Sequence, residues 1–208
     1  MLTKSIAGFK IFNINSDFLR IRRALQYYQV KNRVLKFSQF LTLKEVKKKG
    51  FDKCVSSVIL PKDKNLIQIV AYCIMPTHLH LILKQLKENG ISIFMGNLLN
   101  SYSRYFNIRY KRKGPLWEGR FKSILIENGE YLLHLTRYIH LNPTTANLVR
   151  KPEDWELSSY KEYILNKKDA LCDYSDLLDI SKKSYREFVE DRISYQKELH
   201  KIKRLILE

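Results

Sequence analysis

The segment LIQIVAYCIMPTHLHLILK, residues 66–84, constrains the fold of this chain more than any other. Its first ten residues are apolar except for Gln68 and rich in β-branched side chains, as in a buried strand, and Pro76 ends that run. From residue 78 onward, leucine alternates with other side chains, so an extended chain places the three leucines on one face. The opposite face then carries His78, His80, Ile82 and Lys84. The pattern predicts two strands of a sheet whose leucine face packs against a core.

Helical periodicity and stop signals predict most of the remaining elements. Gly50 ends the first helical stretch, and Pro143 is expected to end the third helix near Asn142, because a residue before proline disfavours helix. The expected helices span residues 17–49, 90–110, 130–141 and much of 151–208. Two further strands are expected, one at 54–60, paired with the apolar strand through a turn at 61–65, and a short one at 119–126.

The composition is that of a globular protein. A chain of 208 residues can bury a core, and its apolar content of 45% and aromatic content of 12% exclude wholesale disorder, a coiled coil and a collagen-like chain. No run of about 18 apolar residues occurs and residues 1–10 lack an apolar leader, so we expect a cytoplasmic protein without membrane contact. Three cysteines, far apart and odd in number, indicate neither a disulfide framework nor a zinc ribbon.

The net charge of +17, from 38 Lys and Arg against 21 Asp and Glu, predicts a polyanionic partner, and nucleic acid is the commonest. One cationic cluster lies at residues 44–49. A second lies at 104–122, where aromatic side chains alternate with cations, a mixture that holds phosphates and stacks bases. Its candidate nucleic-acid-binding residues are Arg104, Arg109, Lys111, Arg112, Lys113, Trp117, Arg120 and Lys122. The alternative is a solvated basic face over core aromatics, in which Trp117 anchors the 114–115 loop.

The pair His78 and His80 is the candidate for chemistry. Residues i and i+2 of a strand project to the same face, so two imidazoles can converge on one metal ion. By itself this pair is about as consistent with two surface or hydrogen-bonding histidines. A metal would need a further donor, and the third helix offers one: Tyr138 and Asn142 share a helical face, with His134 one turn earlier. A phenol and an amide oxygen beside a metal suit phosphoryl chemistry.

Taken together, these segments resemble the single-tyrosine transposases that carry a histidine–hydrophobe–histidine (HUH) signature, the IS200-like enzymes and the relatives of REP-associated tyrosine transposases. The signature is YCIMPTHLHLIL, residues 72–83. Supporting segments are SYSRYFNIRYKRKGPLWEGRFKS at 101–123, YLLHLTRYIHLNPTTANLV at 131–149 and KPEDWELSSY at 151–160. The resemblance covers about residues 6–165.

The resemblance implies an α+β fold: a ferredoxin-like or RRM-like antiparallel sheet with helices on one face, the HUH strand in its centre, and C-terminal helices. It implies a transposase domain at residues 1–150 and a helical extension at 151–208. It also implies a divalent metal ion, Mg²⁺ or Mn²⁺, held by His78, His80 and Asn142, and Tyr138 as the nucleophile. The first strand, which longer relatives have before residues 4–13, is expected to be short or missing, and a homodimer is one way to cover the edge this would leave.

The implied activity is that of a DNA transposase, which nicks single-stranded DNA beside a hairpin and transfers the strand. Attack by Tyr138 would give a 5′-phosphotyrosine and a free 3′-hydroxyl, and one phosphoester replaces another, so strand transfer needs no ATP. Two alternatives stay open: a catalytically idle nucleic-acid-binding protein with this fold, and a relaxase-like HUH nuclease. A two-histidine phosphoesterase would need a second histidine motif. We expect His134 and His140 to be packing or surface residues, and Lys84 either to assist with phosphate charge or to be an exposed strand-end lysine.

Overall fold

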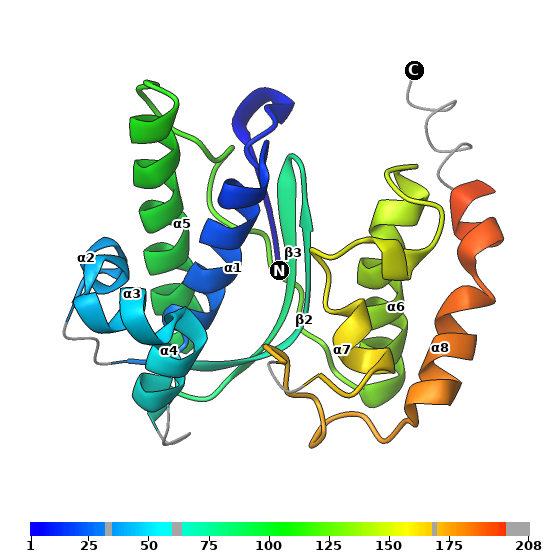
Figure 1. Ribbon diagram of the computed structural model, residues 1–208. Helices are drawn as coiled ribbons and strands as arrows, with labels where there is room; N and C mark the ends of the chain where they lie inside the picture. Colours follow the sequence, from blue (N-terminus) through cyan, green and yellow to red (C-terminus); the bar gives the residue numbers. More distant parts are fainter. Residues whose placement is uncertain (32–34, 60–63, 168–169, 199–208) are drawn as a thin grey trace.

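The fold is a small antiparallel sheet between two layers of helices (Figure 1). The computed structural model describes residues 1–31, 35–59, 64–167 and 170–198. The strands are β1 (Leu2–Lys4), β2 (Ile67–Met75) and β3 (His78–Gln85), in the order β1-β3-β2. The strand that carries the two histidines is therefore central, and the α+β class with an antiparallel sheet is confirmed.

The hairpin of β2 and β3 is the longest pairing in the sheet. It runs from Met75 opposite His78 to Ile67 opposite Gln85, with a bulge near Ile69. The alternation in β3 is confirmed, because its leucines pack on one core while Ile82 packs on the other. On the other edge of β3, β1 pairs only with residues 78–80, so the expected first strand is present but short.

The first helical layer packs on the leucine face of β3. It contains α1 (Asn15–Tyr27) and α5 (Gly90–Arg109), with three short helices outside them. These are α2 (Phe37–Thr42), α3 (Lys44–Lys49) and α4 (Phe51–Ile59). Gly90 starts α5 where a Cβ would lie 2.2 Å from the Leu66 carbonyl oxygen, so only glycine allows this close approach to the chain entering β2.

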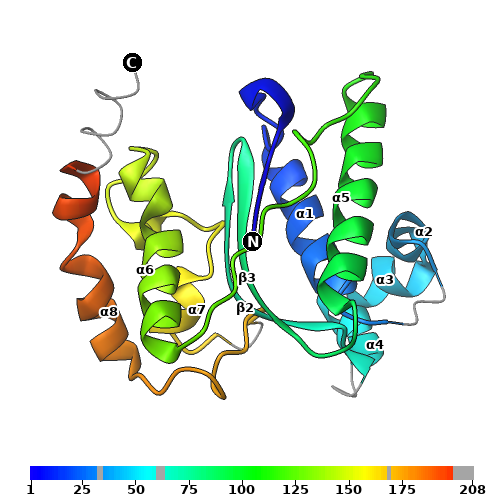
Figure 2. The same cartoon turned by 180° about the vertical axis from the view of Figure 1, so that it is seen from behind.

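A second helical layer covers the opposite face, as the view from behind shows (Figure 2). It contains α6 (Gly129–Thr145), α7 (Tyr160–Ile164) and α8 (Lys182–Glu190). Side chains from these helices share a core with Val70, Cys73 and Ile82 of the sheet. The expectation of helices on one face only is thus corrected: two apolar faces of β2 and β3 each need cover, and the segment after residue 128 supplies the second.

Two predicted strands are wrong. The segment at 54–60 belongs to α4 as far as residue 59, because Phe51 and Val55 lie one turn apart and are both buried, which is helical spacing; residues 60–63 lie outside the described part of the chain. Residues 119–126 form no strand. Their backbone contact with the sheet is the isolated bridge between Leu2 and Lys122, and the side chains of Phe121 and Ile126 pack against the two cores.

The third helix is longer than predicted. It passes through Pro143 and ends at Thr145. Proline removes one backbone hydrogen bond, but Pro143, Thr144 and Thr145 are all buried, and the Leu148 N–H donates to the Pro143 carbonyl oxygen at 2.9 Å. Tertiary packing therefore outweighs the local preference of the residue before proline.

The described part of residues 151–198 contains less helix than expected. Between α7 and α8 the chain is irregular, and residues 193–198 form a last helical stretch. This region also contains the short 3-10 turn η3 (Pro152–Asp154), and a similar turn, η1 (Ile6–Gly8), lies near the N-terminus. Among the described helices, none combines the length and apolar composition needed to cross a bilayer.

Candidate active site

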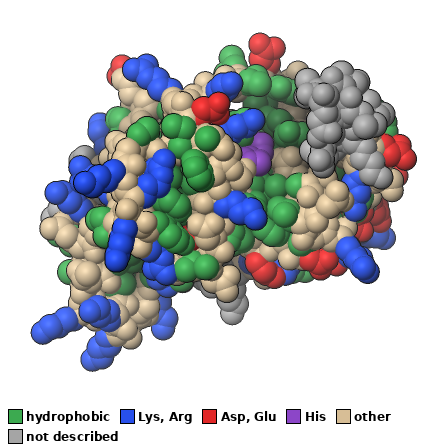
Figure 3. All heavy atoms as spheres, turned by 90° about the horizontal axis from the view of Figure 1, so that it is seen from above, with side chains coloured by type: hydrophobic (Ala, Val, Ile, Leu, Met, Phe, Trp, Pro, Cys, Tyr) green, Lys and Arg blue, Asp and Glu red, His purple; other side chains and the backbone are tan. Residues whose placement is uncertain are grey.

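A cavity of about 930 Å³ opens between the sheet, α6 and the last described residues of the chain. Its lining from β3 is His78 and His80, and its lining from α6 includes Tyr138 and Asn142. The structure thus brings together all four residues that were predicted to form the metal and nucleophile site. In the view from above, histidine side chains are visible in a hollow of the surface (Figure 3).

The two histidines of β3 are held as neutral imidazoles. Their ring centroids lie 4.8 Å apart with the planes at 82°, and the Thr77 hydroxyl lies 2.9 Å from His78 Nδ1, which orients that ring. Burial lowers the pKa of His78 to about 4, with a further contribution from Lys4. Burial, then His78, the N-terminal amino group and Lys4, lower the pKa of His80 to about 3. Neutral imidazoles with free lone pairs are the form that binds metal ions.

Tyr138 faces this pair from α6. Its ring centroid lies 6.1 Å from that of His80, edge-on at 88°, and its side chain is 48% exposed, so the phenol is accessible from the cavity. Asn142 follows one turn later, as the spacing predicted. Its Nδ2 atom is buried without a hydrogen-bond partner in the described structure, and the same is true of Thr145 Oγ1 and Gln196 Nε2, which line the same cavity.

These residues fit a divalent metal ion by the chemistry of their donors. His78 and His80 supply imidazole nitrogens, and Asn142, which borders the same cavity, has a side-chain amide oxygen that can bind a metal ion. This mixed donor set suits a first-row divalent ion and keeps positions open for a substrate. Among the described residues, no cluster of three or more His, Cys, Asp or Glu side chains offers another site.

The charge of the lining was not anticipated from the sequence. Lys4, Arg137 and Arg192 line the cavity, and its lining contains no Asp or Glu among the described residues. Lys4 could have been found only from the pairing of β1, which places it opposite His78. Arg137 directly precedes Tyr138 in sequence, which places it near the site but does not show that its side chain faces the cavity. A cavity with cations and without carboxylates favours an anionic ligand.

The other two histidines of α6 have the packing roles that were expected. His140 is fully buried, and its ring nitrogens lie 2.6 Å from the Tyr185 hydroxyl and 2.7 Å from Ser159 Oγ. His134 Nδ1 accepts from the Arg137 guanidinium at 2.8 Å, and its ring packs against Phe188.

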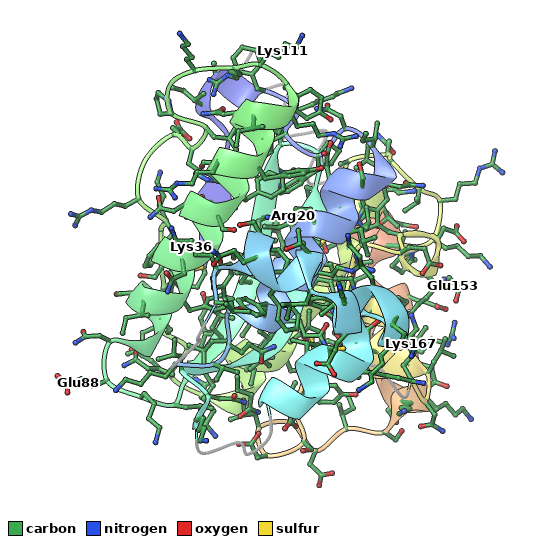
Figure 4. The ribbon with its side chains drawn as sticks, turned by 60° about the vertical axis from the view of Figure 1, so that its left-hand side comes forward. Arg20, Lys36, Glu88, Lys111, Glu153 and Lys167 are labelled. Atoms are coloured by element: carbon green, nitrogen blue, oxygen red, sulfur yellow. The ribbon has the colours of Figure 1, made fainter. Side chains whose placement is uncertain are left out.

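The predicted nucleic-acid-binding residues lie elsewhere, on the second half of α5 and the chain that follows. None of them lines the cavity. Lys111 lies just after the C-terminal end of α5, and Glu88 lies far from it, just before the N-terminal end of the helix (Figure 4). Cationic side chains gather on the α1–α5 side of the molecule in Figure 3. The exposed members of the predicted set are Arg104, Arg109, Lys111, Lys113, Arg120 and Lys122.

Several of these cationic and aromatic groups are engaged within the protein. Arg112 donates to the Pro115 carbonyl oxygen at 2.7 Å, and Arg109 lies 3.7 Å from the buried Asp17 carboxylate. The Trp117 N–H donates to the Leu99 carbonyl oxygen at 3.2 Å and its ring packs on the core, which is the geometry of a loop anchor. Lys84 pairs with Asp176 away from the cavity, so it does not serve the site.

The fold and site define a class of protein: an α+β domain in which a histidine–leucine–histidine strand faces a helical tyrosine and an amide across an anion-attracting cavity. The sequence model of the family described as "Transposase IS200 like" matches residues 38–142, half of the chain, and this segment includes His78, His80, Tyr138 and Asn142. The chain belongs to the family of IS200-like transposases.

Two known proteins are similar to it. A Haemophilus influenzae protein named "Putative REP-associated tyrosine transposase" is 31% identical over 104 residues, which cover 45% of this chain and 58% of that protein. The chain therefore spans less than two thirds of the length of this curated relative. A solved structure, of a REP-associated tyrosine transposase bound to a REP hairpin, matches with a TM-score of 0.48 at 16% identity, over 86% of this chain and 89% of that chain.

Proposed function

We propose that this chain is a metal-dependent transposase that nicks single-stranded DNA beside a hairpin and transfers the broken strand through a 5′-phosphotyrosine on Tyr138. The observation that carries the proposal is the accessible phenol of Tyr138 facing His80 across a cavity that also contains His78 and Asn142. Membership of the IS200-like family supports it, as does the name of the H. influenzae relative.

The residues of the cavity have different roles in the proposed reaction. His78, His80 and Asn142 would hold the divalent ion, which when bound supplies Lewis-acid polarisation of the scissile phosphate. The phenol oxygen of Tyr138 forms a bond to phosphorus while the bond from phosphorus to the 3′-oxygen breaks, and the departing oxygen takes up a proton to become the 3′-hydroxyl. The phenol proton leaves to water. The second step reverses these bonds with a different 3′-hydroxyl.

The charges of the cavity and the surface suit a DNA ligand. Lys4, Arg137 and Arg192 line a cavity without carboxylates, so a phosphodiester there meets attraction only. Outside the cavity, the exposed cations of α5 and residues 111–122 offer phosphate contacts that need no particular sequence. We therefore expect affinity to fall steeply with salt.

The test is formation of a covalent protein–DNA adduct. Labelled single-stranded hairpin oligonucleotides taken from the flanks of the gene would be incubated with the protein and Mn²⁺ or Mg²⁺, then separated on a denaturing gel. We expect a metal-dependent adduct that disappears in Tyr138→Phe. Tyr195→Phe is the matched control, because Tyr195 is the other exposed tyrosine that lines the cavity, and this variant should keep the adduct.

Two results would contradict the proposal. An adduct that persists in Tyr138→Phe and is lost in Tyr195→Phe would move the nucleophile to the C-terminal segment. Tight, salt-sensitive binding with no adduct under either metal would favour an idle nucleic-acid-binding protein.

A further inference from the structure

Arg137 is one of the cavity residues to which the proposed chemistry gives no specific contact. It lies beside Tyr138 on α6, and its guanidinium is held on several sides: one nitrogen donates to His134 Nδ1 at 2.8 Å, another lies 3.5 Å from the Phe188 carbonyl oxygen, and the group sits 4.1 Å above the Phe188 ring. A guanidinium held by hydrogen bonds and stacking loses little further freedom when it binds an anion.

Arg137 has no ion-pair partner among the described residues. Within the described chain, no carboxylate lies within ion-pair distance of Arg137, whereas Arg109, Arg186 and Arg192 each have one. Arg192 also lines the cavity. Burial and then the nearby Arg192 lower the pKa of Arg137, while Asp191, which lies 3.7 Å from Arg192, acts in the opposite direction. Asp191 offsets part of the repulsion between these two cations, and an anion bound between them in the cavity would offset more of it.

The same wall of the cavity carries an unsatisfied hydrogen-bond donor. Gln196, four residues after Arg192, has a buried Nε2 atom without a partner in the described structure, and it lines the cavity as well. A buried amide that makes no hydrogen bond costs free energy unless a ligand supplies an acceptor. Charge and hydrogen-bonding capacity therefore point to the same kind of ligand, an anion with several oxygen acceptors.

We propose that Arg137 and Arg192, with Gln196, form a second phosphate subsite that binds a backbone phosphate of single-stranded DNA next to the one attacked by Tyr138. This inference rests on the proposed function for the identity of the ligand. It makes Arg137 a binding residue that sets the position of the strand, and it makes residues 192–196 part of the substrate site.

Binding measurements with single neutralised phosphates test the subsite without relying on catalysis. A series of hairpin oligonucleotides would each carry one methylphosphonate in the single-stranded flank, and affinities would be measured by fluorescence anisotropy without divalent ion. We expect one position at which neutralisation weakens binding to the wild-type chain about tenfold, as for a charge-assisted contact. Arg137→Gln should weaken binding of unmodified DNA by a similar factor. In this variant, neutralising the phosphate at the sensitive position should cause no further loss of affinity.

The controls separate the subsite from charge and from folding. Arg150→Gln removes the same charge from an exposed site that does not line the cavity, and it should keep the full tenfold loss at the sensitive position. Arg137→Lys keeps the charge but not the stacking on Phe188, and should bind with intermediate affinity. Thermal unfolding of each variant reports on the lost contact with Phe188.

The outcomes are distinguishable from those of the proposed function. If the affinity losses from Arg137→Gln and from the methylphosphonate add at every neutralised position, the subsite is overturned, even if the wild-type chain forms the Tyr138 adduct. Non-additivity at one position without any adduct would support the subsite and count against the chemistry. Failure of the wild-type chain to bind the oligonucleotides would overturn both.

Discussion

Two buried histidines, His80 of β3 and His140 of α6, differ in how their ring nitrogens are satisfied. Burial lowers the pKa of His80 and of His140 alike, to about 3. His140 has a partner at each ring nitrogen and is packed among aromatic rings. His80 borders a cavity, and no described residue hydrogen-bonds to its ring. The comparison teaches that a shifted pKa marks burial, while unsatisfied polar atoms beside open space mark a site.

The largest effect is expected for His80→Ala. Loss of one metal-binding imidazole should reduce adduct formation by at least about 100-fold, because even the outer partners of metal ligands are worth about 10- to 100-fold. Stability should change little, since no protein group loses a hydrogen bond. Gel quantification and thermal unfolding measure the two effects. A large loss of stability with retained activity would show that His80, like His140, is a packing residue.

His140→Ala should show the reverse. It removes two hydrogen bonds, leaves the Tyr185 hydroxyl and Ser159 Oγ buried without this partner, and creates a cavity, so we expect a loss of about 3 kcal/mol in the free energy of unfolding. Urea unfolding measures it, with His134→Ala on the same helix as the control that should cost less. The folded variant should retain adduct formation. A loss below about 1 kcal/mol in the free energy of unfolding would contradict the packing role of His140.

The stability of the chain should fall as the pH falls from about 6.5 to 4.5. His140 takes up a proton below about 6.5 when unfolded but only near 3 when folded, so acid favours the unfolded chain. Each such histidine contributes up to about 1.4 kcal/mol per pH unit in this window. Urea unfolding at several pH values should give a shallower slope for His140→Gln than for the wild type. Equal slopes would show that His140 is not buried as a neutral imidazole.

The smallest expected effect is the thermal stabilisation of the folded chain by a divalent ion, which should depend on His80 but not on His140. For a dissociation constant of about 0.1 mM, 1 mM Mn²⁺ would stabilise the folded chain by about 1.4 kcal/mol and raise its midpoint by roughly 3–5 °C. The shift should vanish in His80→Ala and persist in His140→Gln. Calorimetry or fluorescence unfolding measures it, and a shift that survives in His80→Ala would place the ion elsewhere.

Much of the site follows from local sequence rules. Alternation in residues 78–84 places His78 and His80 on one face of a strand, and a spacing of four places Tyr138 and Asn142 on one face of a helix. These patterns depend only on the repeat of each element, so they hold whatever packs against it. That the strand face and the helix face meet at one cavity was predicted from the family resemblance, not from the periodicity of either element.

The errors of prediction arise where packing outweighs local preference. The segment at 54–59 has the composition of a strand, but it is helical because Phe51 and Val55 are buried together. Likewise α6 continues past Asn142 because its last turn is buried. Local propensities are worth less than about 1 kcal/mol per residue, and burying one large side chain can exceed that.

By itself, the sequence determined the hairpin strand, the histidine pair, the faces of α5 and α6, and the excess of positive charge. Only the tertiary structure decided that helices cover both faces of the sheet, that His140 is satisfied while His80 is not, and that Lys4, Arg137 and Arg192 meet at the cavity. The physical reason is distance along the chain. Periodicity relates residues within one element, whereas contacts between residues 4, 137 and 192 depend on how separate elements bury their apolar faces.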